Sequence, residues 1–295
     1  MAALEGKIAL VTGASSGIGR ATARALAKEG AIVYATARRV ETLTDLKDAG
    51  IRTLALDVSD ETSMVDAVRT VEAEWGAIHT LVNNAGYIQS GVLEEVPLDA
   101  VRSEFEVNVF GMLRMSQLVL PAMRKRGTGR IVNVGSMGGL FAVPGAGAYH
   151  MSKYAVEALT DALRYEVRSF GVDVVLIQPA GVRTAFADTK SSRIPEREGP
   201  YAAFNENYNA VVGELYTENA RGVVSATDVA RVIVDAAIAP RPRTRYKVGL
   251  VAHALPGMRR LLGDRLWDAA MGRLFPMSPG ANRSRAVPDR ARASE

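Results

Sequence analysis

The chain has 295 residues, of which 48% are hydrophobic and 23% charged, a balance that suits one large α/β domain with appendages. It has no cysteine, which excludes disulfides and cysteine metal sites, and its three histidines are too dispersed for a local metal motif. It also lacks an apolar run long enough to span a membrane and the hydrophobic core of a signal peptide. We therefore expect a cytoplasmic, metal-independent protein without a transmembrane segment.

The formal net charge of +4 is concentrated at one end of the chain. Residues 241–295 carry 12 Lys or Arg and 4 Asp or Glu, a balance of +8 that leaves −4 on residues 1–240. A basic tail can bind nucleic acid or anionic lipid, but a solvated chain end is the more ordinary explanation. We expect no nucleic-acid partner and a disordered tail at residues 276–295.

Strand-like runs alternate with helical apolar periodicity along most of the chain. The runs lie at residues 7–12, 32–36, 52–56, 79–82, 130–134, 172–178 and 245–250. Their nearly continuous apolar centres indicate strands that are buried on both faces of a parallel sheet. The pattern predicts an α/β protein with a single-domain Rossmann fold over residues 1–255, built on a doubly wound parallel sheet of about seven strands flanked by helices.

Two helices should be the longest, at about residues 99–126 and 148–170. Asp99 is the expected N-cap of the first, and Gly127 and Gly171 are the expected ends of the two helices. An apolar stripe along the second can pack against the sheet of its own chain or against a second subunit, and the sequence does not separate these two uses.

Two later segments fall outside the regular alternation. Residues 185–222, with a helical patch near 201–216, form a long connection that predicts a substrate loop or lid. Residues 256–275 predict a C-terminal helical extension. Its arginines are scattered around the helix, which argues against a membrane-surface helix, although Trp267 and Phe275 leave apolar surface for a peripheral membrane contact.

A glycine-rich turn directly follows the first expected strand, with the sequence Thr12-Gly13-Ala14-Ser15-Ser16-Gly17-Ile18-Gly19. Glycines in this position permit a tight turn and a close approach of the backbone to a pyrophosphate at the positive end of the next helix. The spacing is G-x-x-x-G-x-G, and a purely structural turn is the alternative. We expect the phosphates of a dinucleotide to contact Gly13, Ser15, Gly17, Ile18 and Gly19.

The end of the second expected strand indicates which dinucleotide is bound. An acidic residue there would bind the ribose hydroxyls of NAD, whereas arginine suits the phosphate of NADP. Residues 33–39 contain no carboxylate and end in Arg38 and Arg39. A solvated arginine pair is the alternative, but arginine at a helix start opposes the helix dipole unless an anion binds. We expect NADP (NADPH) as the cofactor, with NAD less favoured.

Tyr149 and Lys153 lie four residues apart at the start of the second long helix, so they share one face of it. A lysine ammonium beside a phenol favours the phenolate and lowers the pKa of the tyrosine, which makes it a usable proton donor or acceptor. An ordinary amphipathic helix start contains the same residue types, so the neighbouring motifs decide between the two interpretations.

Four features occur in order along the chain. They are the glycine turn at residues 12–19, Asn83-Asn84-Ala85-Gly86, Asn108 within Glu106-Val107-Asn108-Val109-Phe110-Gly111, and Ser136 with Tyr149-x-x-x-Lys153. Together they resemble the short-chain dehydrogenase/reductase family, in its roughly 250-residue branch, over about residues 5–250. The chain looks most similar to members that act on steroids, retinoids or other hydrophobic alcohols and ketones.

The resemblance implies hydride transfer between NADP(H) and a ketone, aldehyde or secondary alcohol. It implies that Ser136 orients the substrate oxygen, that Tyr149 is the general acid and base, and that Lys153 binds the nicotinamide ribose and lowers the pKa of Tyr149. Asn108 matches an asparagine that holds a water of the proton relay. The family usually forms homodimers or homotetramers through its two long helices.

The resemblance also implies further cofactor contacts. They are Asp57 and Val58 near the adenine, Asn84, Ala85 and Gly86 near the adenosine ribose, and Tyr149, Lys153, Val182 and Thr184 near the nicotinamide. Asp57 is equally well explained as a cap at the end of a strand. The family usually has glycine directly after the proline of the segment at residues 179–184, where this chain has Ala180.

The candidate substrate pocket is largely apolar and predicts a small hydrophobic substrate. Its expected lining is Tyr87, Met137, Leu140, Val143, Pro144, His150, Phe186, Tyr201, Phe204 and Tyr208. One alternative function is reduction of a β-ketoacyl thioester of fatty-acid or polyketide type, with a basic docking patch at residues 124–126. Another is a non-catalytic cofactor-sensing or interaction protein, which would not need Asn108, Ser136, Tyr149 and Lys153 together.

Overall fold

The computed structural model describes residues 2–183, 192–195, 198–215 and 222–277. Thr184 and Phe186, and nearly all of the basic tail at 276–295, lie outside these residues.

A seven-stranded parallel sheet forms the centre of the protein, in the order β3-β2-β1-β4-β5-β6-β9. Its strands are β1 Ile8–Val11, β2 Ile32–Ala37, β3 Arg52–Ala55, β4 Thr80–Asn83, β5 Gly129–Val134, β6 Val172–Pro179 and β9 Arg245–Val248. Each lies within a residue or two of one of the seven expected runs, so the predicted doubly wound parallel sheet is confirmed. The longest register joins β5 to β6, from Gly129 opposite Val172 to Val134 opposite Ile177.

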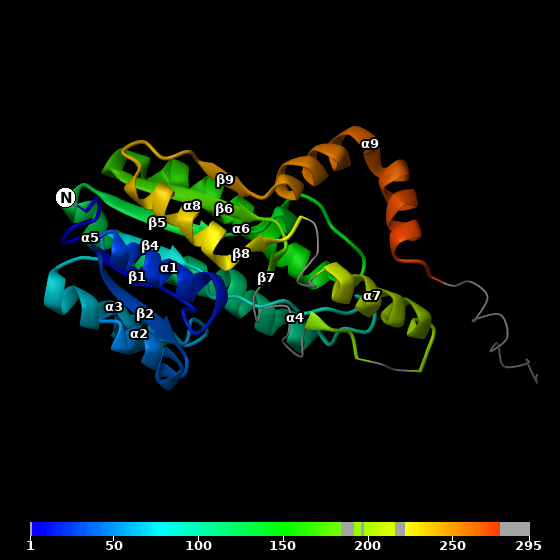
Figure 1. Cartoon of the computed structure of the whole chain (residues 1–295), viewed down its shortest axis with the longest axis horizontal. Helices are drawn as coiled ribbons and strands as arrows, with labels where there is room; N and C mark the ends of the chain where they lie inside the picture. The colour runs from blue at the N-terminus through cyan, green and yellow to red at the C-terminus, as the bar shows by residue number, and fades with distance from the viewer. Residues whose placement is uncertain (1, 184–191, 196–197, 216–221, 278–295) are drawn as a thin grey trace, which may run out of the picture.

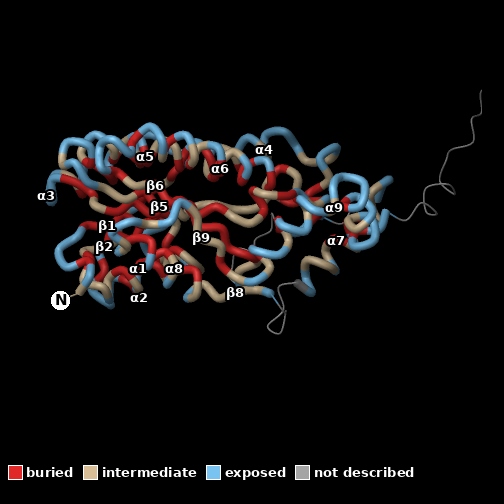
Figure 2. The backbone as a smooth tube through the Cα atoms, turned by 90° about the horizontal axis from the view of Figure 1, so that it is seen from above, coloured by how far each residue is buried: buried red, intermediate tan, exposed pale blue. Residues whose placement is uncertain are grey.

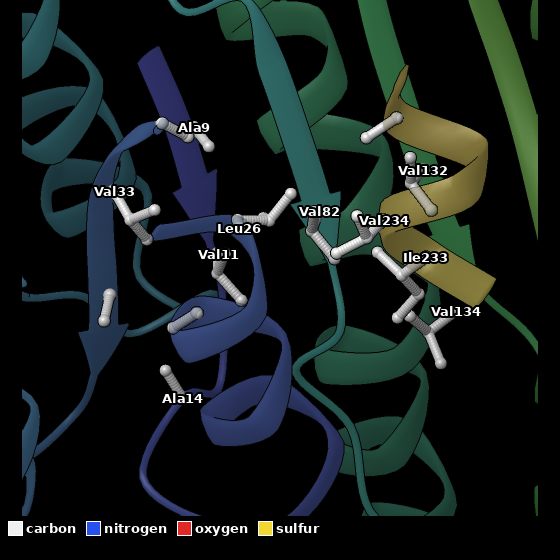
Figure 3. Packing of buried hydrophobic residues seen from close by; sticks show 14 of the residues in the cluster. Ala9, Val11, Ala14, Leu26, Val33, Val82, Val132, Val134, Ile233 and Val234 are labelled. Atoms are coloured by element: carbon white, nitrogen blue, oxygen red, sulfur yellow. The ribbon is translucent and has the colours of Figure 1, made fainter. Parts of the chain in front are cut away.

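Helices cover both faces of this sheet (Figure 2). One face is covered by α1 Gly17–Lys28, α2 Thr44–Asp48 and α8 Ala226–Ile238, and the other by α3 Glu61–Trp75, α5 Gly111–Arg126 and α6 Gly147–Val167. The alternation along β1 shows why the strands are apolar throughout. Ala9 and Val11 face the α1 and α8 side (Figure 3), whereas Ile8 and Leu10 face the α3 and α5 side. Both sets are removed from water, which is the main stabilising contribution to such a core.

The first long helix differs from the expectation. It is divided into α4 Leu98–Phe105, a π-helical turn at Glu106–Phe110, and α5, and the residue at its N-cap is Pro97. Asp99 lies instead in the first turn, where its carboxylate is 2.7 Å from the guanidinium of Arg102. A π-helical turn contains one residue more than an α-helical turn, and this difference is too small to be detected in the apolar pattern of the sequence. Gly127 and Gly171 end the two long helical segments with φ of 69° and 73°, as predicted.

Two helices, α7 Ala202–Leu215 and α9 Leu250–Leu274, lie beyond the sheet, at the end of the molecule opposite the N-terminus (Figure 1). The C-terminal helix begins at Leu250, earlier than the expected residue 256, and is kinked at Gly263, where φ is 64°. Tyr208 of α7 packs against Phe275 at the end of α9, with ring centroids 5.9 Å apart. A two-residue strand β7 Val182–Arg183, not expected from the sequence, pairs with β8 Val224–Ser225. No helix in the described part of the chain is long and apolar enough to cross a membrane.

Candidate active site

The carboxyl ends of the parallel strands meet at one edge of the sheet, and the strand order reverses between β1 and β4. Ligands of doubly wound sheets bind in the crevice at such a reversal. The loops after four strands bring the predicted site residues to this edge: Gly13 to Gly19 after β1, Asn84 to Gly86 after β4, Ser136 after β5 and Val182 after β6. Residues spread over most of the chain are therefore gathered in one place.

The glycine turn fits a pyrophosphate because backbone occupies the space where side chains would be. Gly13 and Gly17 have φ of 67° and 54°, in the region that favours glycine. A Cβ atom on Gly13 would lie 2.8 Å from Cα of Ala85, and one on Gly19 would lie 2.5 Å from Nδ2 of Asn84. The turn thus lies directly against the loop after β4, and its backbone N–H groups lead into the N-terminus of α1.

Thr12 fastens these two loops together and was not among the predicted site residues. Its Oγ1 accepts hydrogen bonds from the backbone N–H groups of Asn84 and Ala85, each at 3.0 Å. The Asn84 side chain returns two bonds, from Nδ2 to the carbonyls of Thr12 (2.9 Å) and Gly13 (3.1 Å). The position of Thr12 directly before the glycine turn was the available signal, but its partners lie about 70 residues away in sequence.

Arg38 and Arg39 are exposed at the carboxyl end of β2. Within the described residues neither side chain forms an ion pair or a hydrogen bond, and no carboxylate stands on this strand. Two guanidinium groups that form no hydrogen bond or ion pair among the described residues are donors of the kind that bind phosphate groups.

Asp57 and Val58 follow β3 at the same edge. Oδ1 of Asp57 accepts hydrogen bonds from the backbone N–H (3.0 Å) and the hydroxyl (2.6 Å) of Ser59, which is the geometry of a strand-end cap. Val58 is buried against Gly111, where any Cβ atom would overlap Val58. The contacts observed for Asp57 are those of the capping interpretation, and its contact with adenine stays a prediction.

Ser136, Tyr149 and Lys153 come together at the junction of β5 and α6. The Ser136 hydroxyl accepts a hydrogen bond from the N–H of Gly138 at 3.0 Å. Nζ of Lys153 lies 5.7 Å from the centre of the Tyr149 ring and donates to the carbonyl of Val134 at 3.2 Å. Burial lowers the pKa of Lys153 to about 8, an effect that the negative charge of Glu104 opposes.

Asn108 lies in the π-helical turn and is fully buried. Its Oδ1 accepts from the Tyr87 N–H at 3.0 Å, and its Nδ2 donates to the Tyr87 carbonyl at 2.9 Å and to the Ser152 hydroxyl at 3.1 Å. The side chain therefore holds the loop after β4 against α6, and its amide hydrogen bonds go to protein groups. The water-holding role that the resemblance implies stays a prediction.

Glu104, on α4, was not predicted as a site residue, yet it is 0% exposed and lies behind this group. Its Oε1 accepts from the Gln89 N–H at 3.1 Å, whereas Oε2 has no hydrogen-bond partner in the part of the chain that the structure describes. Burial raises the pKa of Glu104 to about 7, and the hydrogen bond from Gln89 and the charge of Lys153 act in the opposite direction. Because Glu104 lies on a short helix with other charged residues, its burial could not be predicted from the sequence.

An apolar cavity of about 400 Å³ lies beside the loop of residues 142–147, which connects Ser136 to Tyr149. Four of the predicted pocket residues line it: Val143, Pro144, Tyr201 and Phe204. The other side is formed by residues of α9 and its end that were not predicted: Trp267, Asp268, Met271 and Met277. The C-terminal extension therefore forms one wall of the cavity.

The other predicted pocket residues on described positions, Tyr87, Met137, Leu140, His150 and Tyr208, do not line this cavity, so their contact with a substrate stays a prediction. The Tyr208 hydroxyl is 3.0 Å from the Ser90 hydroxyl inside the packed base of α7. Nδ1 of His150 lies 2.7 Å from the Gly138 carbonyl, so the His150 ring contacts the loop that follows β5. Both polar groups are therefore used in buried contacts within the protein.

Comparison with known proteins agrees with this architecture. The family model for short chain dehydrogenases matches residues 7–195. The chain belongs to the short-chain dehydrogenase family. It is therefore an oxidoreductase of that family, and the resemblance of its four motifs is confirmed at this level; the narrower likeness to steroid and retinoid enzymes stays a prediction.

Two relatives illustrate the range of the family. A 3-ketodihydrosphingosine reductase of Bacteroides thetaiotaomicron is 38% identical over 206 residues, which cover 70% of this chain and 72% of the relative. An NADPH-dependent 3-dehydrocapnine reductase of Ornithobacterium rhinotracheale is 31% identical over 272 residues, which cover 89% of this chain and 95% of the relative.

Two solved structures show the same fold. A short-chain dehydrogenase from Streptomyces avermitilis superimposes with a TM-score of 0.77 at 33% identity, covering 90% of this chain and 97% of that one. A short-chain dehydrogenase/reductase from Burkholderia phymatum, solved in complex with NAD, gives a TM-score of 0.75 at 29% identity, covering 89% and 95%. A nicotinamide cofactor is thus supported for the family to which this chain belongs.

Proposed function

We propose that this chain is an NADP(H)-dependent oxidoreductase that transfers hydride between the nicotinamide and a hydrophobic ketone, aldehyde or secondary alcohol, with Tyr149 as the general acid and base. The observation that carries the proposal is the approach of the buried Lys153 ammonium to within 5.7 Å of the Tyr149 ring centre. A positive charge held there favours the phenolate and brings proton transfer by Tyr149 into the neutral pH range.

The residues around Tyr149 have complementary tasks in this mechanism. Because Ser136 Oγ accepts from the Gly138 N–H, its own proton points elsewhere and is available to a substrate oxygen. Tyr149 gives its proton to that oxygen in reduction and removes it in oxidation. Lys153 stabilises the phenolate left behind, and Asn108 and Ser152 fix the loop and helix that carry these groups. When bound, the nicotinamide supplies or accepts the hydride.

The cofactor is proposed from the residues that would hold it. The turn from Gly13 to Gly19 would hold the pyrophosphate, and Arg38 and Arg39 would hold the phosphate that distinguishes NADP from NAD. The relative from Ornithobacterium rhinotracheale is NADPH-dependent by name, which supports this choice, while the Burkholderia phymatum structure contains NAD, so direct measurement is required. We expect Arg38→Ala and Arg39→Ala to raise KM for NADPH and to leave KM for NADH unchanged.

The substrate class is proposed from the apolar cavity beside the loop of residues 142–147, which leads from Ser136 to Tyr149. Its lining is apolar apart from the Tyr201 hydroxyl and Asp268, and it contains no arginine or lysine to hold a carboxylate. The names of both relatives describe the reduction of ketones, which agrees with a ketone as one substrate.

The alternative of a carrier-bound β-ketoacyl thioester is not favoured by any observation. The basic residues 124–126 end α5 and lead into the start of β5, so they lie at the edge of the sheet opposite to Tyr149. The guanidinium of Arg124 also lies over the Phe170 ring, 5.6 Å from its centre, so this arginine takes part in a contact within the protein. A carrier docked there would present its thioester to the wrong end of the protein.

We also propose a homodimer or homotetramer formed through the outer faces of α5 and α6. Met151, Tyr154 and Tyr165 on α6 are 46%, 46% and 69% exposed, which is apolar surface suited to a second subunit. Light scattering on the purified protein would measure the assembly.

The decisive experiment follows NADPH and NADH oxidation against a panel of hydrophobic ketones and aldehydes. We expect turnover with NADPH, and we expect Tyr149→Phe to lose about 100-fold or more in kcat while it binds NADPH normally. Near-wild-type turnover by Tyr149→Phe would sink the proposed mechanism, and a preference for NADH would refute the roles of Arg38 and Arg39.

A further inference from the structure

The hydrogen bonds of the buried Glu104 side chain do not require a negative charge. Its Oε1 accepts from the Gln89 N–H (3.1 Å) and lies 3.5 Å from Nδ2 of Asn108, while Oε2 has no partner among the described residues. A glutamine would accept the same bonds through one oxygen and would avoid the cost of burying an ionisable group. A glutamate at this position therefore has another use or is a net cost to the fold.

Glu104 is linked to the helix that carries Lys153 through Asn108, whose Nδ2 lies 3.5 Å from Oε1 of Glu104 and donates to the hydroxyl of Ser152, the residue before Lys153. α4 packs against the start of α6, which carries Lys153 with only 7% of its surface exposed. The two charges attract each other, but they form no ion pair within 4.0 Å, so the interaction is through space. Among the described residues, Glu104 also interacts with the Tyr87 phenol from the loop after β4, whose pKa is raised by burial and by the charge of Glu104 and lowered by the charge of Arg38.

Lys153 needs a counter-charge because of its surroundings. Its amine donates to a backbone carbonyl, that of Val134, and none of the ion pairs in the described residues includes it. Desolvation of an unpaired ammonium favours the neutral amine. A neutral Lys153 would no longer stabilise the Tyr149 phenolate, so catalysis by the proposed mechanism depends on keeping this amine protonated.

We propose that Glu104 is a positioning residue that acts through Lys153: its buried carboxylate keeps the lysine ammonium protonated and thereby sets the pH range in which Tyr149 exchanges its proton. The inference rests on the proposed function of Tyr149 and Lys153. It adds a residue from α4 to the group formed by the loop after β5 and by α6, with Asn108 and Ser152 between the two helices.

The direct test is ¹⁵N NMR of the lysine amines, in which the Lys153 signal is assigned by its loss in Lys153→Gln. We expect Glu104→Gln to lower the pKa of Lys153 by about one unit. Glu104→Asp keeps the charge and should leave the Lys153 pKa near its value in the wild type, which guards against a loss of structure in one variant. The matched control is Glu106→Gln, which removes an exposed carboxylate two residues away and should leave Lys153 unchanged.

The functional readout is the pH profile of kcat for carbonyl reduction. The alkaline limb should move to lower pH by about the same one unit in Glu104→Gln and return in Glu104→Asp. An unchanged Lys153 pKa in Glu104→Gln would overturn the inference, and so would an equal loss of activity at every pH in both Glu104 variants. Because the NMR titration requires no turnover, a wild type without reductase activity would refute the proposed function and leave the role of Glu104 separately measured.

Discussion

Trp267 is the buried residue with which the C-terminal helix lines the cavity, and its removal should change both stability and substrate binding. The side chain is 4% exposed, and its Nε1–H donates to the carbonyl of Ala142 at 3.3 Å. Its ring meets that of Phe141 edge-on at 5.6 Å. It therefore ties α9 to the loop of residues 142–147 that forms the other side of the cavity.

The expected cost of Trp267→Ala follows from these contacts. Truncation of a buried aromatic side chain to alanine costs about 3–5 kcal/mol in well-packed cores. Since α9 lies beyond the sheet and buries few of its own residues, we expect the lower part of this range, about 3 kcal/mol, in the free energy of unfolding. Trp267→Phe keeps an aromatic ring and loses the hydrogen bond, worth about 1 kcal/mol.

The assay combines urea unfolding with steady-state kinetics on a hydrophobic ketone. In Trp267→Ala we expect KM for the ketone to rise about tenfold or more, with KM for NADPH unchanged because the cofactor edge does not include α9. Trp267→Phe should lie between the alanine variant and the wild type in both measurements. If Trp267→Ala binds hydrophobic ketones as well as the wild type, the cavity under α9 is not the substrate site and the reasoning fails.

Two further predictions test separate parts of the structure. Gly19→Ala places a Cβ atom against Nδ2 of Asn84 and should abolish nucleotide binding measured by fluorescence titration, whereas Gly213→Ala, with open space around its Cα, should bind as the wild type does. The pKa of His79 is lowered to about 4, first by burial and then by the charges of Arg126 and Lys7. Because the folded pKa lies below that of the unfolded chain, neutral His79 contributes stability above pH 6.5 that is lost as the pH falls toward 4. Since His79 is partly exposed, we expect this loss of unfolding free energy to be about 1–2 kcal/mol. Denaturant titrations at pH 7 and pH 4 should show that His79→Asn loses less unfolding free energy on acidification than the wild type does. An equal loss in both proteins would contradict the assignment.

The site residues that sequence motifs indicated are those whose chemistry depends on local spacing. Gly13, Gly17 and Gly19 are needed because of the turn itself, and Tyr149 and Lys153 share a face because helices have 3.6 residues per turn. Each of these requirements can be read from a few consecutive residues. Thr12 and Glu104 were missed because their partners, the loop after β4 and the start of α6, are distant in sequence.

The lining of the substrate cavity could be predicted only in part, for the same reason. Aromatic residues such as Tyr201, Phe204 and Tyr208 look equivalent in sequence, but only the first two of these three line the cavity, whereas the Tyr208 hydroxyl lies 3.0 Å from that of Ser90. The contribution of Trp267 depends on a helix that folds back from the far end of the chain.

The sequence by itself determined the parallel sheet, the glycine turn, and the pairing of Tyr149 with Lys153, because strand burial, backbone freedom and helical periodicity act over a few residues at a time. Only the tertiary structure decided which polar groups are buried and which segments line the cavity. Burial and electrostatic interaction depend on distances between segments far apart in the chain, and it is these distances that give Glu104 a raised pKa and make α9 a wall of the cavity.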